Sequence, residues 1–348
     1  MIFPRLLLVT LALTAPLAAA TRAKPTRPDS SDLGSYKGAI VMDAATGNIL
    51  FENNPDVVTP PASMTKLMTF AVLHDKLADK SISLDTMVTV SRDEAKFAMR
   101  SDSTSVWLKE KETFPVEELI YAMMIQSAND AALTLARAAG GSPEAFIELM
   151  NAKARELGMK NSIFRTPHGL TRGKISQEVS DVTSPRDFAI LCRHLLLHTD
   201  VLKYTSIKTR SFGASQRTQL VEMSNHNKLL GKVNGVDGLK TGYTTGAGYC
   251  LSATAQRNGR RLIVVIMGSF GPKGAIDKGR TRDLKTIELI EQGFTALPPG
   301  SPAFASSVTP GTAADTTTLA PAPLTTAEKK AGAPADPVIK FSLPGAKK

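Results

Sequence analysis

Hydrophobic residues recur along the first two thirds of the chain in patterns typical of strands and of helices. Two apolar runs on either side of residues 44–47 predict a β-hairpin over residues 36–43 and 48–52. A short strand is predicted at 87–90, and residues 161–181 show no period and predict a long loop. Elsewhere, apolar positions three and four residues apart indicate helices. These helices cover residues 63–77, a short segment that Ser91 opens, 114–124, 131–139, 142–156 and 184–198.

After Thr209 the hydrophobic pattern changes to that of strands. Three strands are predicted at 236–240, 248–255 and 261–268, and Asn258-Gly259 between the last two is a strong hairpin signal. A helix over 282–294 follows. We therefore predict an α+β fold, with one antiparallel sheet flanked by helices and a mainly helical subdomain.

Both ends of the chain differ from this pattern. Residues 1–20 carry Arg5, an apolar run and three alanines, which predicts a secretory signal peptide. Residues 21–34 are polar and predict a loose N-terminal arm. Residues 295–348 are rich in Pro, Ala and Thr and predict a disordered tail. One domain is thus expected over residues 35–294, in a protein exported to the periplasm.

Composition narrows the classes of partner. The formal net charge is +10 at pH 7, and removal of Arg5 with the signal leaves about +9. The basic residues are scattered, and export makes nucleic acid the least suitable partner, so we expect none. Cys192 and Cys250 each lie in an apolar stretch. We expect two buried thiols rather than the disulfide that export would permit.

Residues 60–69 place a serine and a lysine at the start of a predicted helix. Pro60 and Pro61 exclude helix before them, and Ser63 and Lys66 share one helical face because they are three residues apart. A serine becomes a nucleophile when a neighbouring base takes its proton. A lysine is such a base once its pKa is depressed, which the helix dipole and burial both promote. The alternative is an ordinary amphipathic helix with an exposed serine and lysine.

Two later motifs carry compatible chemistry. Ser127 and Asn129 lie at a break between helices, where a hydroxyl can relay a proton and an amide can hold substrate. The alternative is that either residue only caps the next helix. Lys240, Thr241 and Gly242 end a strand, where small residues let a substrate backbone approach and the lysine attracts a carboxylate.

The sequence predicts no metal site and no cofactor. His194 and His198 lie four residues apart on a predicted helix, but no third ligand accompanies them. We interpret them as packing and surface histidines.

The three motifs occur in the order Ser63-x-x-Lys66, Ser127-x-Asn129 and Lys240-Thr241-Gly242, which matches the penicilloyl serine transferases. Over residues 37–294 the chain resembles the low-molecular-mass penicillin-binding proteins that are D-alanyl-D-alanine carboxypeptidases. The resemblance rests on residues 62–69, 127–132, 167–170, 236–244, 247–249 and 282–294. It implies the penicillin-binding and serine β-lactamase-like transpeptidase fold.

The resemblance also implies a role for each motif residue. Ser63 would be the acylated nucleophile, Lys66 its general base and Ser127 a proton relay. The backbone N–H groups of Ser63 and Tyr243 would form the oxyanion hole, and Thr241 and Arg282 would hold the substrate's terminal carboxylate. The full set of expected substrate-binding residues is Asn129, Lys240, Thr241, Gly242, Tyr243 and Arg282.

The activity that the resemblance implies is removal of the terminal D-alanine from peptidoglycan stem peptides, without a metal. β-Lactams would be covalent inhibitors. The alternatives are a DD-endopeptidase that cuts cross-links, a serine β-lactamase and a non-catalytic cell-wall binding module. A β-lactamase ranks lower because no Glu-x-x-Leu-Asn string occurs in the loop region.

Two departures from the family pattern bear on function. Tyr243 stands where many relatives have histidine. Only the low-complexity tail follows Phe294, where relatives often carry a second domain and a membrane anchor, so peripheral attachment to the inner membrane is left open.

Overall fold

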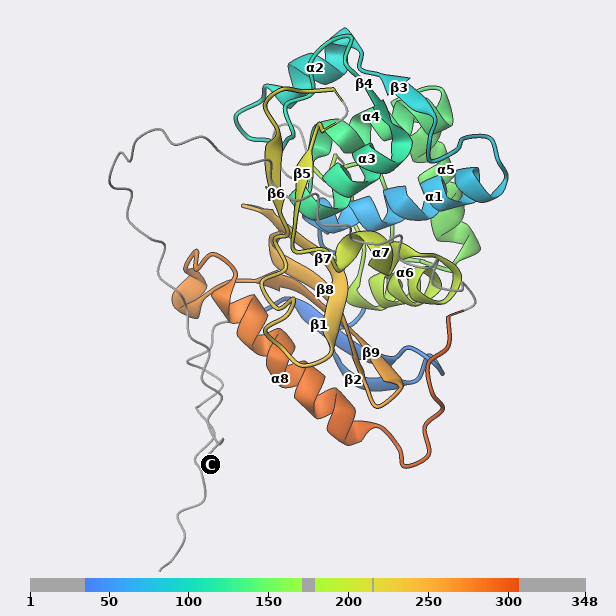
Figure 1. Cartoon of the computed structure of the whole chain (residues 1–348). Helices are drawn as coiled ribbons and strands as arrows, with labels where there is room; N and C mark the ends of the chain where they lie inside the picture. The colour runs from blue at the N-terminus through green and yellow to red at the C-terminus, as the bar shows by residue number, and fades with distance from the viewer. Residues whose placement is uncertain (1–34, 171–178, 215, 307–348) are drawn as a thin grey trace, which may run out of the picture. The chain divides into compact units, whose positions relative to one another are not determined.

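The computed structural model describes residues 35–170, 179–214 and 216–306, and an antiparallel sheet of five strands lies at its centre (Figure 1). The strand order β2-β1-β9-β8-β7 puts the N-terminal hairpin beside the C-terminal strands. The strand bounds are β1 Gly38–Asp43, β2 Ile49–Asn53, β7 Val236–Thr244, β8 Gly248–Arg257 and β9 Arg260–Ser269. The predicted α+β fold is confirmed.

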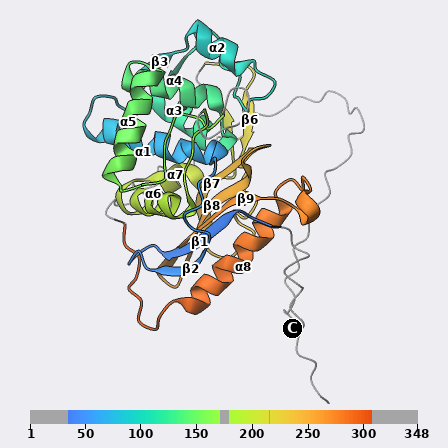
Figure 2. The same ribbon diagram turned by 180° about the vertical axis from the view of Figure 1, so that it is seen from behind.

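Local sequence explains the hairpin between β8 and β9. Asn258 and Gly259, which join β8 to β9, have φ values of 49° and 75°, as the turn requires. Helix α8, Arg280–Ala296, covers one face of the sheet and lies across β1 and β2 (Figure 2). Leu289 and Ile290 of α8 pack there against Val41 and Leu262. Because residues on both faces are buried, β8 and β9 read as nearly continuous apolar runs.

The other face of the sheet carries the helical part of the molecule. Helix α1 is buried from Lys66 to Leu73 and contacts α4, α5 and α6. The helix bounds are α1 Lys66–Ala78, α2 Arg92–Ala98, α3 Val116–Tyr121, α4 Asn129–Gly140, α5 Pro143–Glu156, α6 Pro185–His198 and α7 Val201–Thr205. Two small sheets pair β3 Met87–Thr89 with β4 Thr113–Pro115, and β5 Thr209–Phe212 with β6 Val221–Ser224.

The predicted helix over 114–124 is wrong at its start. Phe114 belongs to β4, where it pairs with Val88, and α3 begins only at Val116. Pro115 is the physical reason, because a proline disfavours helical backbone in the residue before it. The helix then widens into a π-helical turn, Ala122–Gln126, ahead of the predicted break.

Residues 295–306 are more ordered than their composition predicts. Helix α8 runs two residues past Phe294, and Leu297 is buried. The backbone N–H of Phe304 donates to Gly259 O at 2.8 Å, and its ring packs against the main core. This aromatic residue gives residues 297–306 an apolar anchor, so the prediction of disorder is wrong for that part.

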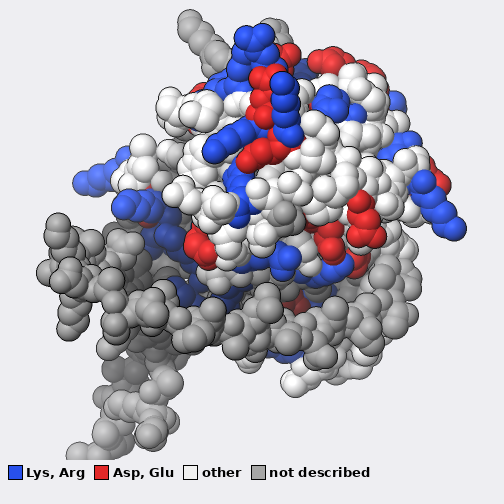
Figure 3. Space-filling view, turned by 45° about the horizontal axis from the view of Figure 1, so that its top comes forward, with Lys and Arg blue, Asp and Glu red and all other residues white. Residues whose placement is uncertain are grey.

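The predicted signal peptide, the arm at 21–34 and the tail beyond Ser306 lie outside the described residues. Within the described ranges, no helix combines the length and the hydrophobicity needed to cross a bilayer. Basic and acidic side chains are interspersed over the upper part of the surface, in keeping with the scattered charges of the sequence (Figure 3).

Candidate active site

Ser63 lies on a tight turn that packs between two other segments of the chain, the loop after α5 and strand β7. Residues Ala62–Thr65 form a 3-10 turn, and α1 continues from Lys66. A Cβ on Gly169 would overlap the carbonyl oxygen of Ala62, and one on Gly242 would overlap that of Pro61. The turn is therefore pressed between the loop after α5 and strand β7, at places where only glycine fits.

The amine of Lys66 has three hydrogen-bonding neighbours. Its Nζ lies 3.1 Å from Ser63 Oγ, 2.6 Å from Asn129 Oδ1 and 2.8 Å from His168 O. Both the amide oxygen and the backbone carbonyl can only accept, so each takes an N–H of the lysine. A neutral amine has two N–H groups and one lone pair, and the lone pair is then left facing the Ser63 hydroxyl.

The surroundings of Lys66 favour this neutral form. Burial of the side chain, with the positive charge of Lys240 as a second cause, lowers the pKa of Lys66 well below its usual value. The carboxylates of Asp181 and Asp130 oppose the shift without cancelling it. Asp181 is already committed to Thr65 Oγ1 at 2.7 Å and to the backbone N–H of Arg165 at 2.7 Å.

The predicted helix break occurs at Ser127 and Ala128, and Asn129 is already the first residue of α4, two residues earlier than predicted. Ser127 ends the π-helical turn with a φ of 61°, and α4 starts at Asn129. The Asn129 side chain donates to Ser103 Oγ at 3.0 Å while its oxygen accepts from Lys66. The buried Asp130 accepts from the backbone N–H groups of Val106 and Leu108, at 3.3 and 3.1 Å, and so holds the loop that carries Ser103.

The same contacts correct one expectation about Trp107. As the lone tryptophan of the chain, Trp107 is expected in the core, but it is 51% exposed. Because Asp130 draws the N–H groups of Val106 and Leu108 inward, the residue between them points to solvent.

Strand β7 is an edge strand and forms one wall of the site. Lys240 is buried, its Nζ donates to Thr241 O at 3.2 Å, and burial and the charge of Arg282 lower its pKa to about 7. Tyr243 is 39% exposed and stacks on Tyr249, with ring centroids 4.2 Å apart. The strand thus presents a partly charged lysine and an aromatic surface beside the serine.

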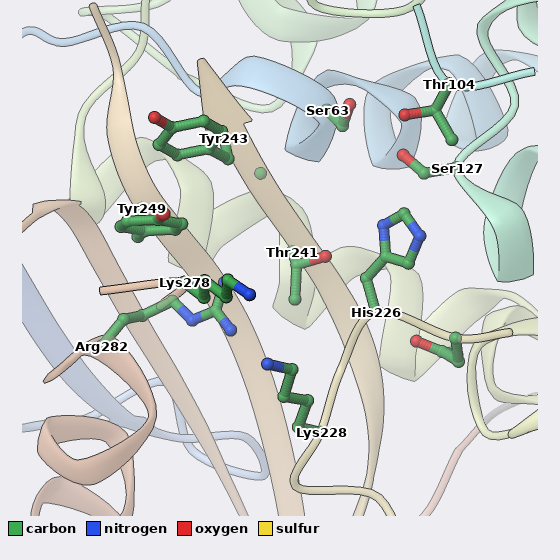
Figure 4. A pocket seen from close by; sticks show the side chains of 12 residues that line it. Ser63, Thr104, Ser127, His226, Lys228, Thr241, Tyr243, Tyr249, Lys278 and Arg282 are labelled. Atoms are coloured by element: carbon green, nitrogen blue, oxygen red, sulfur yellow. The ribbon is translucent and has the colours of Figure 1, made fainter. Parts of the chain in front are cut away.

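A cavity of about 470 Å³ joins these elements (Figure 4). At one end, Figure 4 shows the hydroxyls of Ser63, Ser127 and Thr104 together. Six predicted site residues line the cavity, namely Ser63, Ser127, Thr241, Gly242, Tyr243 and Arg282. The other three, Lys66, Asn129 and Lys240, are buried next to it.

Sequence reasoning missed half of the cavity lining. The additional residues are Thr104, Asn225, His226, Lys228, Tyr249 and Lys278. Most come from loops without a recognisable motif, and Tyr249 lies in a segment that carries the family resemblance but no predicted role. Partial desolvation in the cavity and the charges of Lys240 and Lys66 lower the pKa of His226 to about 4, so its ring is neutral at pH 7.

Within the described ranges, no group of three His, Cys, Asp or Glu side chains is arranged to hold a metal ion. The rings of His194 and His198 lie 5.1 Å apart and contact each other. Cys192 and Cys250 are free and buried, as predicted.

Comparison with known proteins identifies the family. A family model described as D-alanyl-D-alanine carboxypeptidase matches residues 24–271. The D-alanyl-D-alanine carboxypeptidase DacF of Bacillus subtilis is 33% identical to this chain over the matched residues. The match covers 74% of this chain and 62% of that relative's length. A D-alanyl-D-alanine endopeptidase of Pseudomonas aeruginosa is 29% identical over 85% of this chain and 92% of its own length.

A solved structure is also similar to this chain. Penicillin-binding protein D2 from Listeria monocytogenes, in its cefotaxime-bound form, superimposes with a TM-score of 0.62 at 32% identity. The match covers 74% of this chain and 97% of that one. From the family match, the motifs and this similarity we conclude that the chain belongs to the D-alanyl-D-alanine carboxypeptidase family.

Proposed function

We propose that the protein is a serine-type D-alanyl-D-alanine carboxypeptidase that removes the terminal D-alanine from peptidoglycan stem peptides. The observation that carries this proposal is the geometry of Lys66. Its two acceptor-only neighbours, Asn129 Oδ1 and His168 O, leave the lone pair of a neutral amine for the Ser63 proton. This arrangement makes Lys66 the general base of acylation.

Each step of acylation then has a residue. Lys66 takes the proton from Ser63 Oγ, which attacks the carbonyl carbon of the penultimate D-alanine to form an ester. The carbon–nitrogen bond breaks, and the proton that Lys66 took passes through the Ser127 hydroxyl to the departing amine, which leaves Lys66 neutral again. A water molecule later attacks the ester, which releases the shortened peptide and restores the Ser63 hydroxyl.

Binding and charge stabilisation come from β7 and α8. The N–H groups of Ser63 and Tyr243 act as the oxyanion hole, aimed at the charge that develops on the attacked carbonyl. Thr241 and Arg282 hold the terminal carboxylate of the substrate, and Lys240 adds positive charge. All of these residues line the cavity or lie beside it.

Labelled penicillin followed by mass mapping tests this proposal. A relative of similar structure was solved with cefotaxime bound, and we expect a β-lactam to acylate this chain at Ser63. The same preparation should release D-alanine from a stem pentapeptide. Ser63→Ala should lose both the adduct and the release, whereas wild-type-like turnover by Ser63→Ala would contradict the mechanism.

A second candidate is DD-endopeptidase activity with the same residues. The observation in its favour is that the similar endopeptidase is matched over nearly its whole length. A digest of cross-linked muropeptides separates the two activities. Loss of dimers without release of terminal D-alanine would favour the endopeptidase.

For location, we propose the periplasm, on the basis of the N-terminal sequence. N-terminal sequencing of the protein from a periplasmic extract should begin at or after residue 21. Retention of the full-length chain in the cytoplasm would contradict this.

A further inference from the structure

The two ends of the cavity differ in charge. Figure 4 shows the Ser63 and Ser127 hydroxyls at one end and Lys228, Lys278 and Arg282 toward the other, with Thr241 between them. Among the described residues, the cavity lining contains no Asp or Glu. The end away from the serine is therefore a cationic recess.

The three cations of this recess are not equivalent. Arg282 is buried, and its Nε and Nη2 donate to Asp283 Oδ1 at 3.0 and 2.7 Å. Lys228 and Lys278 are exposed, and within the described ranges neither has a carboxylate within 4.0 Å. The nearby Asp277 accepts from the N–H groups of Gly279 and Thr281 rather than from a lysine. Among the described residues, neither lysine thus forms an ion pair, although the charge of Lys228 acts on Asp283, the partner of Arg282.

A terminal D-alanine does not use these two charges. Its single carboxylate is accounted for by Thr241 and Arg282 in the function proposed above. The leaving residue carries that carboxylate, so it lies on the side of the cavity that holds Lys228 and Lys278 (Figure 4). A leaving residue with a second carboxylate would reach two lysines that form no ion pair with any other described residue.

We propose that Lys228 and Lys278 form a second anion subsite, which selects leaving groups that carry a further carboxylate beyond the one beside the scissile bond. A peptide cross-link supplies such a leaving group when its acceptor strand is acidic, whereas free D-alanine does not. This inference rests on the proposed serine DD-peptidase function and names the preferred substrate class of the same site.

Two peptides that differ only in charge provide the test. Both have a diacetyl-L-lysyl-D-alanyl donor, and the leaving residue is D-glutamate in one and its neutral isostere D-glutamine in the other. One exposed ion pair shifts an equilibrium by up to about fivefold. With two lysines, we expect kcat/KM to favour D-glutamate roughly five- to tenfold at low salt, and salt to reduce the preference.

The variants address the lysines directly. In Lys228→Gln/Lys278→Gln the ratio of the two kcat/KM values should fall to about one, and in Lys228→Glu/Lys278→Glu it should fall below one. Lys273→Gln is the matched control, because Lys273 is an exposed lysine before Lys278 that does not line the cavity. It should keep the wild-type ratio. Both rates come from one preparation, so the ratio does not depend on the folded fraction.

The outcomes separate this inference from the proposed function. Equal rates for the two peptides in wild type, or a preference that survives in the double glutamine variant, would overturn the subsite. Release of D-alanine from a stem pentapeptide would still support the serine DD-peptidase in that case. No turnover of any peptide and no penicillin adduct would overturn both.

Discussion

Asn129 accepts a hydrogen bond from Lys66, so a substitution at this position can change the protonation of the lysine while the neighbouring side chain keeps its shape. Asn129→Asp replaces an amide oxygen, 2.6 Å from Lys66 Nζ, by a carboxylate oxygen of the same shape. The amide is neutral and the carboxylate is charged. The substitution should therefore stabilise the ammonium form of Lys66 and raise its pKa.

The size of the shift follows from Coulomb's law. Opposite unit charges 4 Å apart interact by about 4 kcal/mol at an effective dielectric constant of about 20. That energy corresponds to about three pKa units, so the neutral fraction of Lys66 should fall by up to about a thousandfold, with the full loss reached at pH values below the wild-type pKa. Acylation of Ser63 needs the neutral amine and should slow by a similar factor at each pH.

The assay is the second-order rate of acylation by a fluorescent penicillin between pH 5 and pH 10. The wild-type rate should rise with pH as Lys66 loses its proton, and the rise should lie about three units higher in Asn129→Asp. Asn129→Ala is the control, because it removes the hydrogen bond without adding charge and should slow acylation without an upward shift of the profile. An Asn129→Asp profile that coincides with wild type would refute the general-base role of Lys66.

Three further outcomes are expected from the structure. Gly169→Ala should lower both Tm and the acylation rate, because the added Cβ would overlap the turn that carries Ser63. Gly158→Ala is the control: Gly158 has a similar φ but open space around it, so the acylation rate should change little. Lys240, whose pKa is lowered to about 7, is cationic below that pH, so KM for a carboxylate-bearing peptide should rise above pH 7. Lys240→Arg should remove this rise. A flat KM between pH 6 and 8.5 in the wild type would contradict the expectation. Burial raises the pKa of the Cys192 thiol to about 12 and that of Cys250 to about 11, so neither should react with iodoacetamide until the protein is denatured.

The positions of Ser63, Lys66 and Ser127 in the fold could be predicted because they depend on residues that are close together in the sequence. Ser63 and Lys66 are neighbours on one turn, and the break at Ser127 is visible as a run of small polar residues between apolar ones. Helix α2 shows the same kind of local signal, because Ser91 and Glu94 form the reciprocal hydrogen bonds of a capping box at its start. Local patterns of this kind fix an element before any tertiary contact forms.

The rest of the cavity could not be predicted because tertiary contacts bring it together. His226 and Lys228 follow β6 in a loop, and Lys278 precedes α8, so nothing in their neighbourhoods signals a shared cavity. Short elements were missed for a related reason. The five-residue helix α7 and the four-residue strands β5 and β6 are too short to show a period.

The hydrogen bonds of Lys66 also link activity to the completion of folding. The amine gathers partners that are 3, 63 and 102 residues away along the chain. Contacts of such long range form late, after the chain has closed large loops. A partly folded chain, or a fragment without residues 129 and 168, contains the serine but lacks the partners that orient its base. Under the proposed function, covalent labelling by a β-lactam should therefore count only the molecules in which these distant segments have met.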